Sequence, residues 1–119
     1  MHQRPYEKLI VVWKEAHALS LFIYSVTKFF PPEERFRLVH QMCKSAYGVP
    51  MNIAEGNTRR TTRDKQHFLD MAMASLEELH YQCLLARDLR YLTQALFDDA
   101  DDRIQRVSYL LTRLYASLK

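Results

Sequence analysis

Hydrophobic residues recur along the chain at intervals of three and four, the spacing that places side chains on one face of an α-helix. The first such stripe consists of Val12, Ala16, Leu19, Ile23, Val26 and Phe30. It stops at Pro31-Pro32, because a proline removes a backbone N–H and disfavours helical geometry for the residue before it. The pattern predicts a first helix over about residues 8–30.

A second stripe predicts a helix over about residues 34–57, and it consists of Phe36, Val39, Cys43, Ala46, Pro50 and Ile53. Pro50 lies inside this helix, where its missing N–H leaves the carbonyl of Ala46 without its usual donor. We therefore predict a kink at Pro50. Gly56 is expected to end the helix with a left-handed cap.

Two more stripes predict helices over about residues 62–91 and 97–118. The third consists of Leu69, Ala72, Leu76, Leu79, Cys83 and Ala86, and the fourth of Phe97, Ala100, Ile104, Val107, Leu111, Leu114 and Leu118. Thr61 is expected to cap the third helix by accepting a hydrogen bond from the amide of Asp64. The acidic run 98–102 is expected to begin the fourth helix, where negative charge favours the positive end.

Four amphipathic helices with short connections predict an all-α fold, a left-handed, antiparallel up-down-up-down four-helix bundle in one domain over residues 1–119. Composition agrees, because 2 glycines and 4 prolines are too few for the turns of a β-sandwich or barrel. The longest uninterrupted apolar run, residues 9–13, is far shorter than the ~20 residues of a membrane-spanning helix. We therefore expect a cytoplasmic protein that does not cross a membrane.

Residue types that form metal centres, nucleophiles and phosphate loops show no pattern here that favours such a site. A di-iron centre in a bundle takes a Glu-x-x-His pair from each of two helices, and the chain has only Glu77 with His80, for which a solvated helix flank is the favoured interpretation. Cys43 and Cys83 fall in core stripes, where a thiol is unreactive. With only two glycines, no glycine-rich phosphate loop is possible. We expect no catalytic residue, metal, cofactor or small-molecule substrate, and no enzymatic activity.

Positive charge is unevenly distributed, although the formal net charge is only +3. In the predicted bundle, the two termini and the connection between the second and third helices share one end, which holds the excess. We call this end the basic pole, and its candidate phosphate-binding residues are Arg59, Arg60, Arg63, Lys65, Arg113 and Lys119. Aromatic residues are absent from residues 59–65, which favours contact with the phosphates of RNA or DNA over base stacking. Charges that serve only solubility are an equally weighted alternative.

Apolar residues outside the four stripes exceed what the flanks of a small monomeric bundle usually carry. They are Trp13, Leu21, Phe22, Tyr24, Phe29, Met42, Tyr47, Met51, Met71, Met73, Tyr81, Leu84, Leu85 and Tyr109. Aromatic residues and methionine are enriched in protein interfaces. We therefore expect a homo-oligomer, and the alternative is an interaction scaffold that recruits another protein without binding nucleic acid.

Several segments of the chain carry a family resemblance. They are Val12-Trp13-Lys14-Glu15-Ala16, residues 30–36, and above all Pro50-Met51-Asn52-Ile53-Ala54-Glu55-Gly56 followed by Arg59-Arg60. The chain resembles the four-helix-bundle proteins encoded in intervening sequences of bacterial 23S ribosomal RNA genes. Similarity extends to the accessory variability protein of diversity-generating retroelements, a basic pentamer that binds nucleic acid.

This resemblance implies a homopentameric ring and brings no catalytic residue with it. It assigns structural roles to Pro50, Asn52, Ala54, Glu55 and Gly56, and we expect Asn52 and Glu55 to form hydrogen bonds across helices. The chain departs from the family pattern at three positions, namely Gly48, Thr61 and Asp64, where the family usually has Ser, Ser and Glu.

Overall fold

A computed structural model describes residues 5–118, with side chains from Lys8 onward. It contains the helices α1 (Pro5–Thr27), α2 (Leu38–Asn57), α3 (Thr62–Asp88) and α4 (Gln94–Ser117), and a short 3-10 helix, η1 (Pro32–Glu34). No strand occurs within residues 5–118. The prediction of an all-α fold with four long helices is confirmed.

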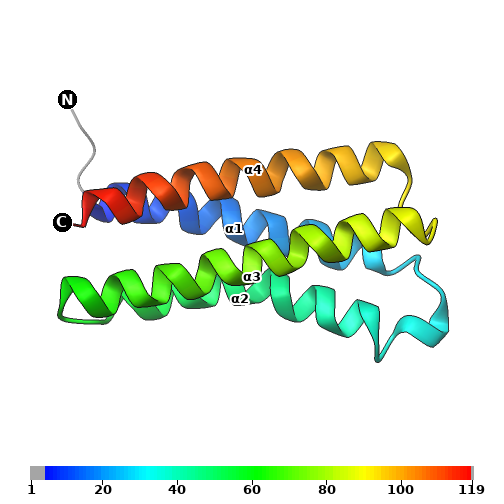
Figure 1. Ribbon diagram of the computed structural model, residues 1–119, viewed down its shortest axis with the longest axis horizontal. Coiled ribbons are helices and arrows are strands. Elements are labelled where there is room, and N and C mark those ends of the chain that lie inside the picture. Colours follow the sequence, from blue (N-terminus) through cyan, green and yellow to red (C-terminus); the bar gives the residue numbers. More distant parts are fainter. Residues whose placement is uncertain (1–4, 119) are drawn as a thin grey trace.

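The molecule measures 44 × 27 × 18 Å. The four helices lie side by side along its longest dimension (Figure 1). Each helix packs against two others, and the contact between α2 and α3 is the most extensive. The α2–α3 turn, the start of α1 and the end of α4 lie at one end, and the other two connections lie at the opposite end (Figure 1). An antiparallel up-down-up-down order with a left-handed twist, and a kink at Pro50, stay predictions.

Two helices end earlier than the sequence predicts. Helix α1 ends at Thr27 instead of Phe30, because the chain turns ahead of the two prolines and Phe30 packs into the core from the connection. Helix α3 ends at Asp88 instead of residue 91. There, Arg90 adopts a left-handed backbone (φ 66°), and the Tyr91 amide donates to the carbonyl of Ala86 at 2.8 Å. This hydrogen bond closes the helix end in the manner usually reserved for glycine.

The starts of α3 and α4 are set by side-chain caps. The hydroxyl of Thr61 accepts a hydrogen bond from the amide of Asp64 at 3.1 Å, which confirms the predicted cap of α3. The hydroxyl of Thr93 does the same for the amide of Leu96 at 3.1 Å, so α4 begins at Gln94 rather than at residue 97. The expectation that the acidic run 98–102 begins this helix is therefore wrong, because the run lies beyond the first turn.

The predicted stripe of α2 is confirmed in its second half and wrong at two positions. Ala46, Pro50 and Ile53 are buried as predicted. The helix begins at Leu38, after η1 and a turn, so Phe36 lies outside it and is 84% exposed. Cys43, predicted to lie in the core, is only half-buried. The full set of buried positions is wider than the stripe, and it consists of Met42, Ser45, Ala46, Val49, Pro50, Ile53 and Gly56.

The face of α2 that meets α3 carries both glycines of the chain. A Cβ at Gly48 would lie 2.9 Å from Oγ of Ser75, and a Cβ at Gly56 would lie 3.0 Å from Cβ of Phe68. Gly56 has no positive φ and lies inside α2, so the expectation of a left-handed cap is wrong. At Gly56 the helices approach too closely for a side chain, whereas at Gly48 the nearest atom is a hydroxyl oxygen at the end of a short side chain.

The core runs the length of the bundle and includes fully buried residues of α1, among them Val12, Leu19 and Ile23. By length and composition alone, the segment Lys8–Thr27 of α1 is apolar enough to cross a membrane. That observation is weak, because a core helix of a soluble protein passes the same test. The absence of a membrane segment stays a prediction.

Candidate nucleic-acid interface

Three residues of the basic pole lie on the surface of the molecule. Arg60 lies in the α2–α3 turn, Arg63 in the first turn of α3, and Arg113 near the end of α4, and all three are exposed. Within residues 8–118, no ion pair joins any of the three to a carboxylate. The Arg113 guanidinium donates instead to the hydroxyl of Tyr109 at 3.2 Å. Lys119, the last predicted residue, lies outside the described residues.

Arg59 does not belong to this exposed group. Its guanidinium forms an ion pair with Glu55 and lies over the ring of Phe68, 4.5 Å from the ring centroid. The predicted absence of aromatic side chains near residues 59–65 is therefore wrong in three dimensions, because Phe68 stands one helical turn further along. Arg59 joins the end of α2 to α3 through a charge pair and a cation–π contact.

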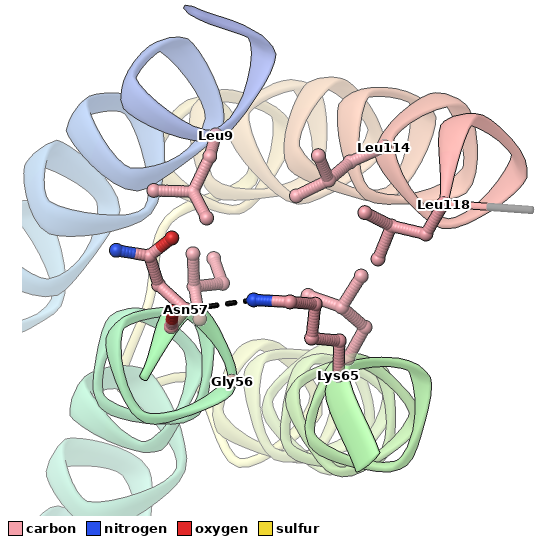
Figure 2. A pocket seen from close by; sticks show the side chains of 8 residues that line it. Leu9, Gly56, Asn57, Lys65, Leu114 and Leu118 are labelled. Atoms are coloured by element: carbon pink, nitrogen blue, oxygen red, sulfur yellow. Dashed lines mark hydrogen bonds between the residues drawn. The ribbon is translucent and has the colours of Figure 1, made fainter. Parts of the chain in front are cut away.

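Lys65 points across the end of the bundle toward the last turn of α2 (Figure 2). Its ammonium group donates a hydrogen bond to the carbonyl of Asn57 at 3.3 Å. The carbonyls at a helix C-terminus lack partners within the helix, and a lysine supplies one here. Among the side chains of residues 8–118, Arg60, Arg63 and Arg113 are thus the basic residues of the pole that are exposed and have no carboxylate partner.

The opposite end has a different balance of charge. Arg87 pairs there with Asp88 at 3.1 Å, and Arg103 pairs with Asp99 at 2.9 Å. Arg87 and Arg103 also lie over the rings of Phe97 and Phe22, respectively. The other arginines of that end are exposed without an ion pair within residues 8–118, and they are Arg35, Arg37 and Arg90. The end as a whole has no positive excess, because its carboxylates outnumber its basic side chains; the carboxylates are Glu33, Glu34, Asp88, Asp98, Asp99, Asp101 and Asp102.

Pro50 shapes the contact between α1 and α2. Because proline has no N–H, the carbonyl of Ala46 loses its donor within the helix. The hydroxyl of Ser20, on α1, lies 3.0 Å from this carbonyl oxygen and 3.1 Å from the carbonyl oxygen of Ala16. Ala46 and Ser20 are both buried, so water does not reach the carbonyl of Ala46. The Ser20 hydroxyl is the donor within reach of this carbonyl. Sequence reasoning identified the orphaned carbonyl and missed the serine.

The remaining polar residues of the motif bond within α2 or to the turn that follows it. The amide of Asn52 donates to the carbonyl of Gly48 at 2.7 Å, and Glu55 pairs with Arg59 one turn away. The expected hydrogen bonds across helices are therefore wrong for both residues. Ala54 is exposed and lines a hollow between α1 and α2.

This hollow interrupts the polar surface of α1 and α2. It encloses about 420 Å³ and is lined by Trp13, His17, Ser20, Leu21, Tyr24, Tyr47, Pro50, Met51 and Ala54. None of these residues is Lys, Arg, Asp or Glu, and Leu21 and Met51 are 59% and 60% exposed. We call it the α1–α2 apolar face. Large apolar side chains with no charge among them are typical of the centre of a protein interface.

Neither cysteine has the setting of a nucleophile. Burial raises the pKa of the Cys83 thiol to about 12, and burial also raises the pKa of Cys43, beside the hydroxyl of Thr27. Both thiols are protonated at neutral pH, and the thiolate is the reactive form. His80 pairs with Asp101 of α4 at 3.2 Å, and the described residues hold no group of three His, Cys, Asp or Glu that would ligate a metal ion.

Comparison of the sequence with models of known protein families identifies one family. Residues 8–113 match the model of the 23S rRNA-intervening sequence protein family. The chain belongs to this family. It also resembles a crystal structure from Bacteroides thetaiotaomicron VPI-5482, a protein of unknown function from the S23 ribosomal protein family. That alignment has a TM-score of 0.85 and 21% identity, and it covers 92% of this chain and 98% of the other.

The solved structure supports the four-helix fold. At 21% identity two proteins can share a fold without sharing a function. No curated protein matches the chain.

Proposed function

We propose that this member of the 23S rRNA-intervening sequence protein family is a non-enzymatic homo-oligomer that binds the phosphates of RNA or DNA through its basic pole. The observation that carries the proposal is the contrast between the two ends. Within residues 8–118, Arg60, Arg63 and Arg113 are exposed without a carboxylate partner, and basic side chains outnumber carboxylates at this pole, whereas carboxylates outnumber basic side chains at the far end. Unpaired arginines release condensed counter-ions when they bind a phosphate backbone, which favours binding.

The proposal includes the architecture that places these residues together, a left-handed, antiparallel up-down-up-down bundle with a bend at Pro50. It also includes a cytoplasmic location. In a closed ring, for which the family resemblance implies five copies, each subunit adds its own arginines to one surface. One subunit's charge is unremarkable, whereas a ring presents several such clusters to one nucleic acid.

The α1–α2 apolar face is the proposed contact between subunits. Replacing Leu21 and Met51 together with Gln is expected to dissociate the assembly, because two exposed apolar side chains at the contact become polar. Light scattering should give the parent a mass that is a multiple of 14.2 kDa and the variant a mass near 14.2 kDa. Met71→Gln, at an exposed methionine of α3, is the control and should leave the mass unchanged. A parent mass of 14.2 kDa at micromolar concentration would refute the oligomer.

Phosphate binding is tested with Arg60→Gln and Arg63→Gln combined in one chain. We expect weaker binding to a structured RNA and to a duplex DNA alike, because phosphate contacts carry no base information. In a fluorescence titration, the log–log salt slope should become shallower by about 0.7–0.9 for each phosphate that the variant no longer neutralises. Arg59 and Lys65 are left unchanged, because both make contacts within the fold.

The matched control is Arg35→Gln with Arg37→Gln, two exposed arginines at the opposite end. These variants should bind like the parent. The alternative function, a scaffold that recruits another protein to the α1–α2 apolar face, is favoured if both double variants lose affinity equally. It is also favoured if the parent shows no binding at about 50 mM salt, where electrostatic contacts are strong.

A further inference from the structure

A cavity opens between the four helices at the end of the molecule that carries the basic pole (Figure 2). It encloses about 140 Å³. Every helix contributes to its wall, through Leu9 of α1, Ile53 of α2, Leu69 of α3 and Leu114 of α4, and Leu118 joins them from the residue that follows α4. Gly56 also borders it and adds no side chain. The wall is therefore almost entirely aliphatic.

The hollow is open to solvent on one side, so it is a pocket rather than a sealed void. Its aliphatic wall offers water few hydrogen-bond partners. A sealed leucine-lined cavity of roughly 150 Å³ accepts a molecule with about six carbons, such as benzene. The volume and lining of this cavity thus suit a short hydrocarbon chain.

The rim of the cavity is polar and positively charged. The ammonium group of Lys65 lies across the opening, and Figure 2 shows it between Asn57 and Leu118. A lysine ammonium has three N–H donors, and the carbonyl of Asn57 accepts one of them. Glu55, a carboxylate on the neighbouring turn of α2, is already paired with Arg59. Donors of Lys65 thus remain for an anion at the mouth of the cavity.

We propose that this cavity binds a small amphiphilic carboxylate, with an aliphatic chain of about four to six carbons among the leucines and its carboxylate on Lys65. The apolar wall stabilises the chain, and the charge-assisted hydrogen bond from Lys65 selects the anionic head. Motifs and composition gave no sign of such a ligand, since the lining residues come from four separate helices. The proposal is independent of phosphate binding, which uses the outward-facing arginines.

The test is a titration of the intact protein with hexanoate, followed by the methyl resonances of its leucines in an NMR spectrum. We expect the methyl groups of Leu9, Leu69 and Leu114 to shift, with a dissociation constant of about 0.1–10 mM for so small a ligand. Hexanol should bind about tenfold more weakly, because it lacks the charge that Lys65 recognises. Hexylamine should bind more weakly still, and acetate, without the chain, should cause no shifts at these leucines.

Two variants separate the head from the chain. Lys65→Gln should abolish the preference for hexanoate over hexanol while leaving hexanol binding intact. Leu118→Trp, at the rim of the cavity, should block both ligands. Lys14→Gln, at an exposed lysine of α1 outside the cavity, is the control and should bind hexanoate like the parent.

Equal binding of hexanoate and hexylamine would overturn the proposal, as would an unchanged preference in Lys65→Gln. So would the absence of shifts at the cavity leucines up to about 50 mM hexanoate, well above the affinity expected for a ligand of this size. Should Leu118→Trp fail to fold, as judged by circular dichroism, Lys65→Gln still decides the question, because its side chain is only half-buried.

Discussion

Gly56→Val is expected to lower the free energy of unfolding by about 1–3 kcal/mol. The added Cβ would lie 3.0 Å from Cβ of Phe68 and 3.4 Å from the backbone oxygen of Lys65. Neither atom moves without its backbone, so α2 and α3 must separate to admit the side chain. Urea unfolding followed by circular dichroism measures the change in stability.

Gly48→Val is the matched comparison on the same face of α2. A Cβ at Gly48 meets Oγ of Ser75 at 2.9 Å, and this hydroxyl can rotate away about the Cα–Cβ bond. The destabilisation should therefore be smaller than at Gly56, and Ser75→Ala in the same chain should recover part of it. Equal stability of Gly56→Val and the parent would show that the glycine is not required by the helix contact.

Ser20→Ala is expected to lower the free energy of unfolding by about 1–3 kcal/mol, the cost of leaving a buried carbonyl without a donor. The carbonyl at stake is that of Ala46, which lies 3.0 Å from the Ser20 hydroxyl and cannot be served by Pro50. In a chain that carries Pro50→Ala, residue 50 regains an N–H that can bond to this carbonyl. The cost of removing the serine should then fall by about 1 kcal/mol.

A double-mutant cycle measures this dependence of one residue on the other. Ser25→Ala is the control, because the Ser25 hydroxyl bonds to the carbonyl of Phe22 on its own helix and lies at the surface. It should show no coupling to Pro50. If Ser20→Ala costs the same with proline and with alanine at residue 50, the hydroxyl does not compensate for the proline.

These two contacts bear on how the motif Pro50-Met51-Asn52-Ile53-Ala54-Glu55-Gly56 works. Pro50 needs a donor from α1, Gly56 needs space beside α3, and Glu55 holds the Arg59 side chain over Phe68. Each of these interactions joins α2 to the rest of the bundle. The motif therefore has a clear structural role, which separates it from the exposed arginines proposed to bind phosphates.

The sequence by itself determined the cores of three helices. The six positions predicted for α3 are its buried residues, from Leu69 to Ala86, and the six predicted for α1 are all buried. In α4 the predicted residues from Phe97 to Leu114 are buried as well. Such stripes can be read locally, because the helical period alone decides which side chains share a face. The cap at Thr61 is equally local, spanning three residues.

Only the tertiary structure decided how wide the buried face of α2 is and which basic residues contact the fold. The predicted positions Ala46, Pro50 and Ile53 are buried, and the close approach to α3 adds Gly56 to them. Arg59 and Lys65 share a charge and a neighbourhood with Arg60, yet Phe68 and the carbonyl of Asn57 hold them against the fold. Ser20 and Ala46 stand 26 residues apart. Contacts between separate helices depend on distances in space, which a one-dimensional pattern does not contain.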